Sequence, residues 1–283
     1  MKKILAAMLL AFLAVSAFGS QKGPSRQEPL RPAKKAPPAC EAYTVVDAAS
    51  GKILESLNPG LKWPPASVTK LMLASVVMEK VRKKELRLSD PVTVSKAAAG
   101  MGGTQVYLKE KEVFSIEELM QAALIESAND AAYAIAEHVA GSTEAFVALM
   151  NSKATALAMH DSEFHSVHGL PPSRDARSNI TTCNDLVKLA KDLLRYPKIL
   201  EWTSTRSATF RNGTFDLHNK NKLVGKIDGV DGLKTGYYYK ARFNIVATGK
   251  NKDKRIIVVV LGSPQARLRD RFAAEKFAEH LAN

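Results

Sequence analysis

The sequence has little of several features that define common classes of protein. Only two of its 283 residues are cysteine, which excludes a small scaffold held together by many disulfides. No group of Cys and His residues has the spacing of a zinc site. Charged residues make up only 24% of the chain against 46% for hydrophobic residues, which excludes a largely disordered protein. We therefore expect a chain of this length to fold around a core of its own, as one or two domains.

Acidic residues are also scarce, with 28 Asp and Glu against 41 Lys and Arg, so the formal net charge is +13. Such a charge predicts nucleic acid, an acidic polymer or an anionic membrane surface as a partner. The charge is unevenly spread, because residues 1–19 carry +2 and residues 21–39 carry +4. Only +7 therefore remains on residues 40–283, where we expect the folded part.

The chain also lacks a hydrophobic run long enough to span a bilayer. The apolar stretch from Ile4 to Phe18 has 15 residues, whereas a membrane-spanning helix needs ~20. Two lysines precede it and small residues follow it, a pattern typical of a cleaved signal peptide at residues 1–19. We expect an exported protein, in the periplasm or the cell-wall space, with no nucleic-acid partner and at most peripheral membrane contact. The Pro/Lys-rich residues 20–39 are expected to be a flexible tether.

An exported protein can form disulfides, so the two cysteines need a separate interpretation. Sequence spacing does not say whether Cys40 and Cys183 approach closely enough to bond, and both a disulfide and two buried thiols remain open. Neither cysteine has a histidine in a recognisable arrangement, which argues against a catalytic thiol.

The hydrophobic pattern changes along the folded part from strands to helices and back to strands. Strands are expected at 42–48, 53–57, 91–94, 209–211, 214–217, 242–248 and 255–261, and helices at 67–82, from the capping box at Ser115, and at 130–140, 143–159, 183–195 and 266–281. The simplest arrangement is a three-layer α/β lobe built from about 40–85 and 200–283, with an all-helical lobe, about 86–199, inserted between. Ligand sites favour the cleft between two such lobes.

The first short motif is Ser67-Val68-Thr69-Lys70, an S-x-x-K at the start of an expected helix. Residues three apart share one face of a helix, so the lysine amine can reach the serine hydroxyl. Serine becomes a good nucleophile only when a neighbouring base takes its proton, and a lysine that burial keeps neutral can be that base. The helix N-terminus also directs backbone N–H groups at a developing oxyanion.

Two further motifs follow at intervals of 60 and 107 residues. Ser127 and Asn129 form an S-x-N, in which the hydroxyl can relay a proton and the amide can hold a substrate amide; simple helix-end capping is the alternative. Lys234, Thr235 and Gly236 form a K-T-G, whose first two side chains can bind a carboxylate while the glycine leaves room for a substrate backbone. A surface lysine in a turn is the alternative here. Lys234 is also a second cation that would lower the pKa of Lys70.

Together the three motifs resemble those of penicillin-binding proteins and serine β-lactamases. Their flanks resemble the low-molecular-mass D-alanyl-D-alanine carboxypeptidases, the S11 serine peptidases, over about residues 42–278. The stretches that carry the resemblance are PPASVTKLM, LMQAALIESANDAAYAIAEHVAGS, VHGL with TTCNDLVKLA, and GVDGLKTGYY. The resemblance implies a β-lactamase/DD-peptidase-like fold, with an antiparallel sheet flanked by helices and an inserted all-helical lobe.

The resemblance also implies a role for each motif residue. Ser67 would attack the carbonyl between two D-alanines of a peptidoglycan stem peptide and form an acyl-enzyme, with Lys70 as general base. Ser127 would pass the proton to the departing D-alanine, and Asn129 would position the amide on the acyl side. β-Lactams would acylate Ser67 as covalent inhibitors.

Lys234, Thr235 and Gly236 would bind the end of the substrate that carries the terminal carboxylate. The backbone N–H groups of Ser67 and Tyr237 would form the oxyanion hole. The resemblance implies no cofactor and no metal, and His168, in a segment similar to one in the family, is expected to be structural.

The sequence departs from the family pattern after the K-T-G. Tyr238 stands where a threonine is common, and Ala241-Arg242 stand where the family often has Ala-Gly, which affects the expected substrate range. No C-terminal β-domain or amphipathic anchor follows the last expected helix, a shorter form shared with relatives that cut D,D cross-links. A D,D-endopeptidase is therefore the alternative activity, and a catalytically silent penicillin-binding or wall-binding protein is a further one. No E-x-x-L-N segment lies between the second and third motifs, which argues against a β-lactamase.

Overall fold

The computed structural model describes residues 39–171, 173 and 176–281. The signal peptide expected at 1–19 and all but the last residue of the tether expected at 20–39 lie outside the described residues. Among the helices that are described, none is both long enough and apolar enough to cross a membrane.

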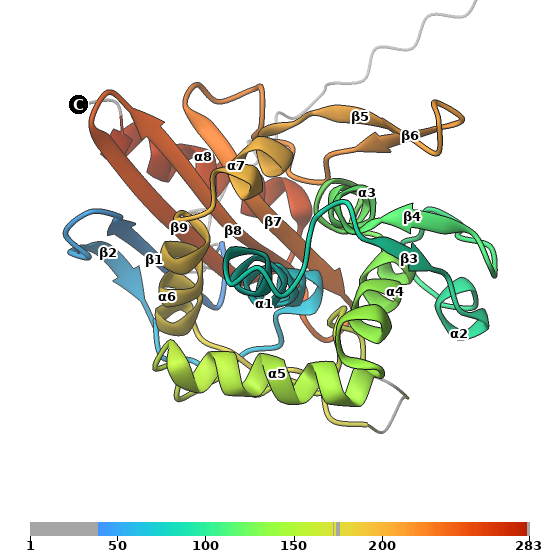
Figure 1. Ribbon diagram of the computed structural model, residues 1–283. Coiled ribbons are helices and arrows are strands. Elements are labelled where there is room, and N and C mark those ends of the chain that lie inside the picture. Colours follow the sequence, from blue (N-terminus) through green and yellow to red (C-terminus); the bar gives the residue numbers. More distant parts are fainter. Residues whose placement is uncertain (1–38, 172, 174–175, 282–283) are drawn as a thin grey trace, which may run out of the picture. The chain divides into compact units, whose positions relative to one another are not determined.

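The centre of the fold is a five-stranded antiparallel sheet in the order β2-β1-β9-β8-β7 (Figure 1). Its strands are β1 (Ala42–Asp47), β2 (Ile53–Leu57), β7 (Val230–Tyr238), β8 (Arg242–Asn251) and β9 (Lys254–Ser263). The two ends of the described chain therefore meet in one sheet, because β1 pairs with β9. The expected hairpins at 42–57 and 242–261 are both confirmed.

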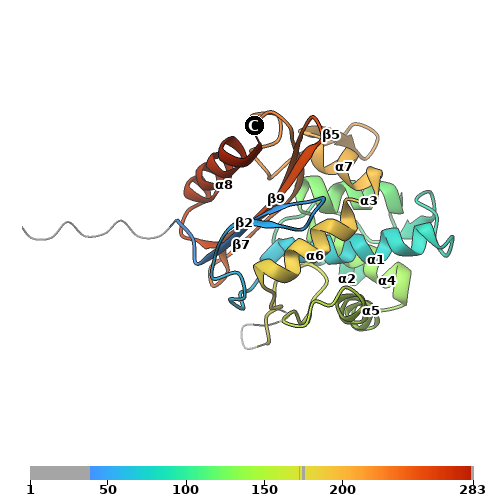
Figure 2. The same ribbon diagram turned by 90° about the vertical axis from the view of Figure 1, so that its left-hand side faces the viewer.

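Helices cover both faces of this sheet, which confirms the expected three layers (Figure 2). The last helix, α8 (Ala266–Leu281), packs on one face together with Val258 and Val260 of β9. The residues that alternate with them, Ile257 and Val259, belong to the larger core on the other face. Since neighbouring strand residues point to opposite faces, one apolar run fills both cores.

The larger core contains most of the helical part of the chain. Its elements are α1 (Lys70–Arg82), α2 (Lys96–Ala99), α3 (Ile116–Gln121), α4 (Asn129–Ala140), α5 (Thr143–Ala156), α6 (Cys183–Leu193) and α7 (Pro197–Ser204), with the two-stranded sheets β3 (Pro91–Thr93)–β4 (Val113–Ser115) and β5 (Ser207–Phe210)–β6 (Phe215–His218). The capping box predicted at Ser115 is present, with Glu118 as its partner. Helix α7 was not predicted, because it has only eight residues including its N-terminal proline, and too few turns exist to show a period.

Helix α1 runs through the middle of this core, so its residues Lys70–Met78 are all buried. A helix that is buried on every side has no polar face, which explains why its apolar residues recur less regularly than those of a surface helix. The helix is preceded by one turn of 3-10 helix, η1 (Ala66–Thr69). The S-x-x-K motif thus straddles the two helices, and its lysine is the first residue of α1.

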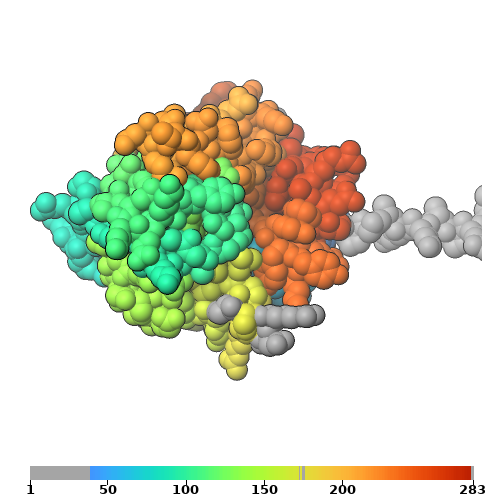
Figure 3. All heavy atoms as spheres, turned by 90° about the vertical axis from the view of Figure 1, so that its right-hand side faces the viewer, coloured from blue at the N-terminus to red at the C-terminus, as the bar shows by residue number. Residues whose placement is uncertain are grey.

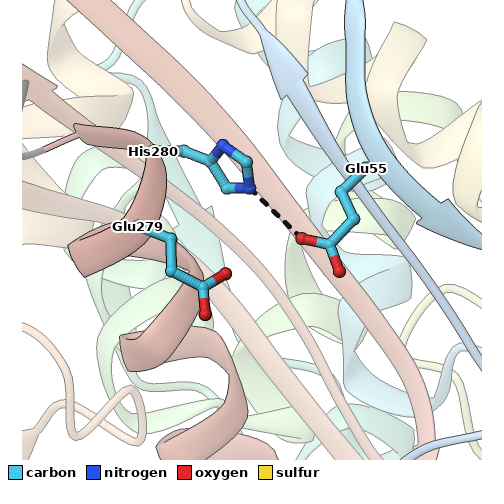
Figure 4. Close-up of side chains that lie close together, drawn as sticks. All are labelled: Glu55, Glu279 and His280. Atoms are coloured by element: carbon cyan, nitrogen blue, oxygen red, sulfur yellow. Dashed lines mark hydrogen bonds and ion pairs between the residues drawn. The ribbon is translucent and has the colours of Figure 1, made fainter.

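On the edge strand β2, Glu55 links helix α8 to the sheet (Figure 4). Its carboxylate lies 2.9 Å from the ammonium of Lys276 and 3.2 Å from Nε2 of His280, and it accepts a 2.6 Å hydrogen bond from Tyr43. Glu55, Glu279 and His280 are the one group of three possible metal ligands within the described ranges. Lys276 already supplies a positive charge to both glutamates, so we interpret the group as an ion-pair network.

Candidate active site

The nucleophile candidate and its expected base lie in contact at the start of the central helix. The Nζ atom of Lys70 is 3.1 Å from Oγ of Ser67, 2.7 Å from Oδ1 of Asn129 and 3.2 Å from the carbonyl oxygen of His168. In the neutral form of the amine, its two N–H groups can donate to these two carbonyl oxygens, and its lone pair can then accept the proton of the serine hydroxyl.

The surroundings of Lys70 favour this neutral form. The side chain is completely buried, and burial together with the nearby positive charge of Lys234 holds its pKa well below the ordinary lysine value. The buried carboxylate of Asp130 acts in the opposite direction but is a smaller influence than burial. The expectation that Lys234 would lower the pKa of Lys70 is thus supported, although burial is the larger cause.

The S-x-N serine has an unusual backbone conformation. The helix opened by the capping box ends in a five-residue π-helix, η2 (Ala122–Glu126), and Ser127 follows it with a φ of 73°. This left-handed conformation is costly for a residue with a Cβ atom, and such outliers cluster at functional sites. The pattern of apolar residues predicts a plain helix here, because the sequence contains no signal for the wider π turn. Ser127 is buried, at 5% exposure.

Asn129, the first residue of α4, is held by bonds from both its side chain and its backbone. Its Nδ2 donates to the carbonyl of Gly102 at 2.8 Å, and its backbone N–H donates to the carbonyl of Thr104 at 2.7 Å. The loop at 102–104 therefore fixes the amide so that Oδ1 points at Lys70. The loop is itself fixed by Asp130, whose carboxylate accepts the backbone N–H groups of Val106 and Leu108.

The K-T-G motif lies on β7, the edge strand nearest to the nucleophile. Lys234 is completely buried, and its pKa is lowered to about 7 by burial and by the positive charges of Lys220 and Arg269. Within the described part of the chain its Nζ has one hydrogen bond, at 3.2 Å to the carbonyl of Thr235. The burial of an ammonium group costs free energy, and one hydrogen bond offsets little of that cost. A substrate carboxylate that binds beside Lys234 would stabilise its charge, which supports the expected anion-binding role.

Gly236 allows the strand to lie directly against the nucleophile. A Cβ atom at this position would be 2.4 Å from the carbonyl oxygen of Pro65 and 3.0 Å from the backbone nitrogen of Ser67. Any side chain would thus push β7 away from η1. The next residue, Tyr237, is paired with Phe243 of β8, and its ring stacks on that of Phe243 with centroids 4.2 Å apart. The two backbone N–H groups expected to form the oxyanion hole therefore come from neighbouring segments.

His168 contributes to the site through its backbone, which the sequence does not reveal. Its carbonyl accepts from Lys70, while burial lowers the pKa of its imidazole to about 3, so the ring is neutral. The following Gly169 has a φ of 95°, and a Cβ there would be 2.0 Å from the carbonyl oxygen of Ala66. The glycine lets this segment contact the turn that carries the nucleophile. This agrees with the expectation that His168 is structural.

The structure adds an ion pair that the motifs do not contain. Glu126 directly precedes Ser127, is 8% exposed and pairs with the ammonium of Lys220. It also accepts a 2.8 Å hydrogen bond from the backbone N–H of His218. Lys220 lowers the pKa of Lys234 and Glu126 raises it, so both charges of the pair act on the lysine of the K-T-G motif. The two residues are about 90 positions apart in the sequence, so no local motif predicts that they pair.

The positions that depart from the family pattern lie where β7 turns into β8. The hydroxyl of Tyr238 is 2.9 Å from Oγ of Ser178. The carbonyl of Ala241 accepts from the indole of Trp63, and Arg242 pairs with Glu41. These three residues thus make contacts that hold the end of the hairpin in place.

The two cysteines are both free and buried. Burial is the main cause that raises the pKa of the Cys40 thiol to about 12 and raises that of Cys183 as well. Thiols of this kind are poor nucleophiles, which supports the expectation that neither is catalytic.

Comparison with known proteins identifies the family. The Peptidase_S11 profile, described as D-alanyl-D-alanine carboxypeptidase, matches residues 31–265. The D-alanyl-D-alanine carboxypeptidase DacF of Bacillus subtilis is 34% identical over 277 residues, which are 95% of this chain and 68% of that protein. A D-alanyl-D-alanine endopeptidase of Haemophilus influenzae is 32% identical over 241 residues, which are 83% of this chain and 80% of that protein.

The solved structures agree. Penicillin-Binding Protein D2 from Listeria monocytogenes, in its ampicillin-bound form, superposes with a TM-score of 0.76 at 31% identity, covering 84% of this chain and 96% of that one. The chain spans between 56% and 69% of the length of the curated carboxypeptidases that it matches. The chain therefore belongs to the S11 family of serine-type hydrolases, the D-alanyl-D-alanine carboxypeptidases.

Proposed function

We propose that this protein removes the terminal D-alanine from peptidoglycan stem peptides through an acyl-enzyme on Ser67. The observation that carries the proposal is the buried Lys70 amine, 3.1 Å from the Ser67 hydroxyl, with its two other neighbours both carbonyl acceptors. A neutral lysine in this position takes the serine proton as the hydroxyl attacks the carbonyl between the two D-alanines.

The remaining motif residues complete the reaction. The negative charge that develops on the attacked oxygen is stabilised by the backbone N–H groups of Ser67 and Tyr237. Ser127 passes the proton to the departing D-alanine, and Lys70 then helps to activate the water that releases the shortened peptide. Asn129 holds the amide on the acyl side.

Lys234 and Thr235 bind the carboxylate of the terminal D-alanine. Lys234 is buried, and the described residues give its amine a single hydrogen bond, to a backbone carbonyl, so binding of a substrate carboxylate stabilises its charged form. β-Lactams carry a carboxylate beside a strained amide, and we propose that they acylate Ser67 as covalent inhibitors. The Listeria relative has been solved with ampicillin and with cefotaxime bound, which supports this part of the proposal.

The proposed organisation follows from the same assignment. Residues 1–19 direct export to the periplasm or the cell-wall space, residues 20–39 are a tether, and residues 40–283 are the peptidase domain. Within that domain the α/β lobe of about 40–85 and 200–283 supplies Ser67, Lys70 and the K-T-G motif. The helical lobe of about 86–199 supplies Ser127 and Asn129, so the substrate binds where the lobes meet.

A D,D-endopeptidase is the second candidate, because the Haemophilus endopeptidase is matched over 80% of its length. Both reactions break a bond after a D-alanine and differ in the group that leaves. The carboxypeptidase releases free D-alanine, whereas the endopeptidase releases a second stem peptide. The chemistry at Ser67 is the same for both.

The test is a product assay with two substrates. The purified protein is incubated with a pentapeptide ending in D-Ala-D-Ala and, separately, with cross-linked muropeptide dimers, and products are separated by chromatography. Release of D-alanine from the pentapeptide is expected, and Ser67→Ala should abolish it. The exposed Ser50 provides the matched control, since Ser50→Ala leaves the site intact. Opening of dimers without release of D-alanine would select the endopeptidase, and no product from either substrate would overturn both.

A further inference from the structure

A basic cavity of about 540 Å³ lies beside the strands β5 and β6, outside the catalytic residues. The β5–β6 segment is the orange surface at the top of Figure 3. The cavity is lined by eight residues of two segments: Arg206, Ser207, His218, Asn219, Asn221, Lys222, Val224 and Lys226. Three of these are cationic, and no acidic side chain is among the described residues that line it.

The three cations have no anionic partner among the described residues. Arg206, Lys222 and Lys226 form no ion pair with any carboxylate in the described part of the chain, and the only side-chain bond of Lys222 is a 3.0 Å contact to the carbonyl of Asn219. Lys220, in the same segment, is by contrast paired with Glu126. Cations left unpaired around one hollow give a positive potential that attracts an anion.

Buried side-chain amides hold the two segments of the cavity wall in place. The side chain of Asn219 donates to the carbonyls of Thr203 and Thr205, and its backbone N–H donates to the carbonyl of Arg206. Asn221 donates to the carbonyl of Gly232 on β7. The positively charged side chains therefore stand on a fixed frame and lose less entropy when a ligand binds.

Arg206 is held in place by a glycine. Gly225 has a φ of 69°, and a Cβ atom there would be 2.3 Å from Cδ and 3.0 Å from Nε of Arg206. The Arg206 side chain therefore passes Gly225 in space that any larger residue at this position would occupy. Guanidinium groups bind carboxylates through two parallel hydrogen bonds.

One stretch of chain separates this cavity from the catalytic residues. The backbone N–H of His218 donates to Glu126, and the backbone N–H of Lys220 donates to the carbonyl of Ile125, so residues 218–220 lie against the segment that ends at Ser127. Asn219 and Asn221 of the same stretch line the cavity. An anion in the cavity is thus held next to the wall of the active site.

We propose that this cavity is a second binding site, which holds side-chain or main-chain carboxylates of peptidoglycan peptides other than the D-alanine being removed. The inference rests on the proposed function, because carboxylates are the anions that a peptidoglycan substrate brings to the protein. Its role is to increase affinity for the intact wall while leaving the reaction at Ser67 unchanged.

The test is co-sedimentation of the full chain with purified sacculi, using the triple variant Arg206→Gln, Lys222→Gln, Lys226→Gln. Loss of three exposed charge contacts is expected to weaken binding roughly tenfold, and the wild-type protein should lose affinity as salt is raised. The triple variant Lys52→Gln, Lys84→Gln, Lys96→Gln, which removes three exposed positive charges from other parts of the surface, is the matched control. Equal binding by the wild type and the triple variant would overturn the proposal.

Two treatments of the sacculi show whether the cavity binds carboxylates or a phosphate polymer. Carbodiimide amidation, which removes carboxylates, should reduce wild-type binding to the level of the triple variant. Hydrofluoric acid, which removes phosphate polymers, should leave wild-type binding unchanged. The reverse pattern would show that the cavity binds a phosphate polymer and would overturn the assignment to carboxylates.

A separate readout keeps this test independent of the catalytic proposal. The triple variant should be acylated by a fluorescent penicillin at the wild-type rate and should release D-alanine from a short pentapeptide as before. If the wild type neither labels nor releases D-alanine, the proposed function fails, whereas the sedimentation result still reports on the cavity. A triple variant that loses labelling would show that these residues act in the catalytic site and would overturn the proposed separation.

Discussion

The Nζ atom of Lys70 lies 3.1 Å from Oγ of Ser67, in a position where the lysine side chain is completely buried. The two residues are one helical turn apart, so the contact is set by local geometry. The lowered pKa of the amine is set by the fold, because the sheet and the helices exclude water from it.

Replacing Lys70 by methionine should remove the base and preserve the packing. Methionine has a similar length and no charge, so the folded protein should be at least as stable as the wild type. Acylation of Ser67 by penicillin should slow by about a hundredfold or more, the usual contribution of a general base. Stopped-flow measurement of acylation tests this, with Lys96→Met on an exposed helix as control. An unchanged rate in Lys70→Met would remove this lysine from the mechanism.

The rate of acylation should depend on pH in two opposite ways. Lys70 must be neutral, so activity is lost as pH falls through its lowered pKa, whereas Lys234 must be charged to hold a carboxylate. Because the pKa of Lys234 is about 7, its contribution is present below that pH and is lost above it. We therefore expect a bell-shaped profile of second-order acylation rates, with its alkaline limb near pH 7 and its acidic limb at the lowered pKa of Lys70.

The alkaline limb of this profile can be assigned with one variant. Arginine remains charged at every pH of the experiment, so Lys234→Arg should shift the alkaline limb to higher pH while leaving the acidic limb in place. An alkaline limb that stays where it is in Lys234→Arg would show that another group titrates.

Replacing Gly236 by alanine should disturb the site more than the fold. The added Cβ would be 2.4 Å from the carbonyl oxygen of Pro65, so β7 must move away from η1. We expect a loss of about 1–3 kcal/mol in the free energy of unfolding, as for other overpacked positions, and a larger relative loss of penicillin labelling. Gly60→Ala is the control, because nothing lies within 4 Å of its Cβ position. Full labelling of Gly236→Ala would contradict the close approach of strand and nucleophile.

Replacing Asp130 by alanine should unfold the loop that positions Asn129. The carboxylate is completely buried and accepts the backbone N–H groups of Val106 and Leu108, which would be left without partners. A cost of about 3 kcal/mol in the free energy of unfolding is expected in urea denaturation. Asp253→Ala, in an exposed turn, should change stability by less than about 0.5 kcal/mol. Equal stabilities of the two variants would show that the loop is held by other contacts.

Much of the fold could be predicted because its signals are local. The strands β8 and β9 are apolar runs on either side of a polar turn, and the capping box of Ser115 and Glu118 marks the start of α3. The π-helix before Ser127 and the short helix α7 were not foreseen. Both depend on how the helix ends pack against other segments, and tertiary packing overrides weak local preferences.

The chemical groups of the site can be identified from the amino-acid sequence, because S-x-x-K, S-x-N and K-T-G place each reactive side chain within a few residues of its motif partner. The behaviour of these groups depends on the folded arrangement. It buries Lys70, brings the carbonyl of His168 to within 3.2 Å of its amine, and pairs Glu126 with Lys220 beside Lys234. Solvent exclusion and charges from distant segments set a pKa, and no spacing along the chain encodes them.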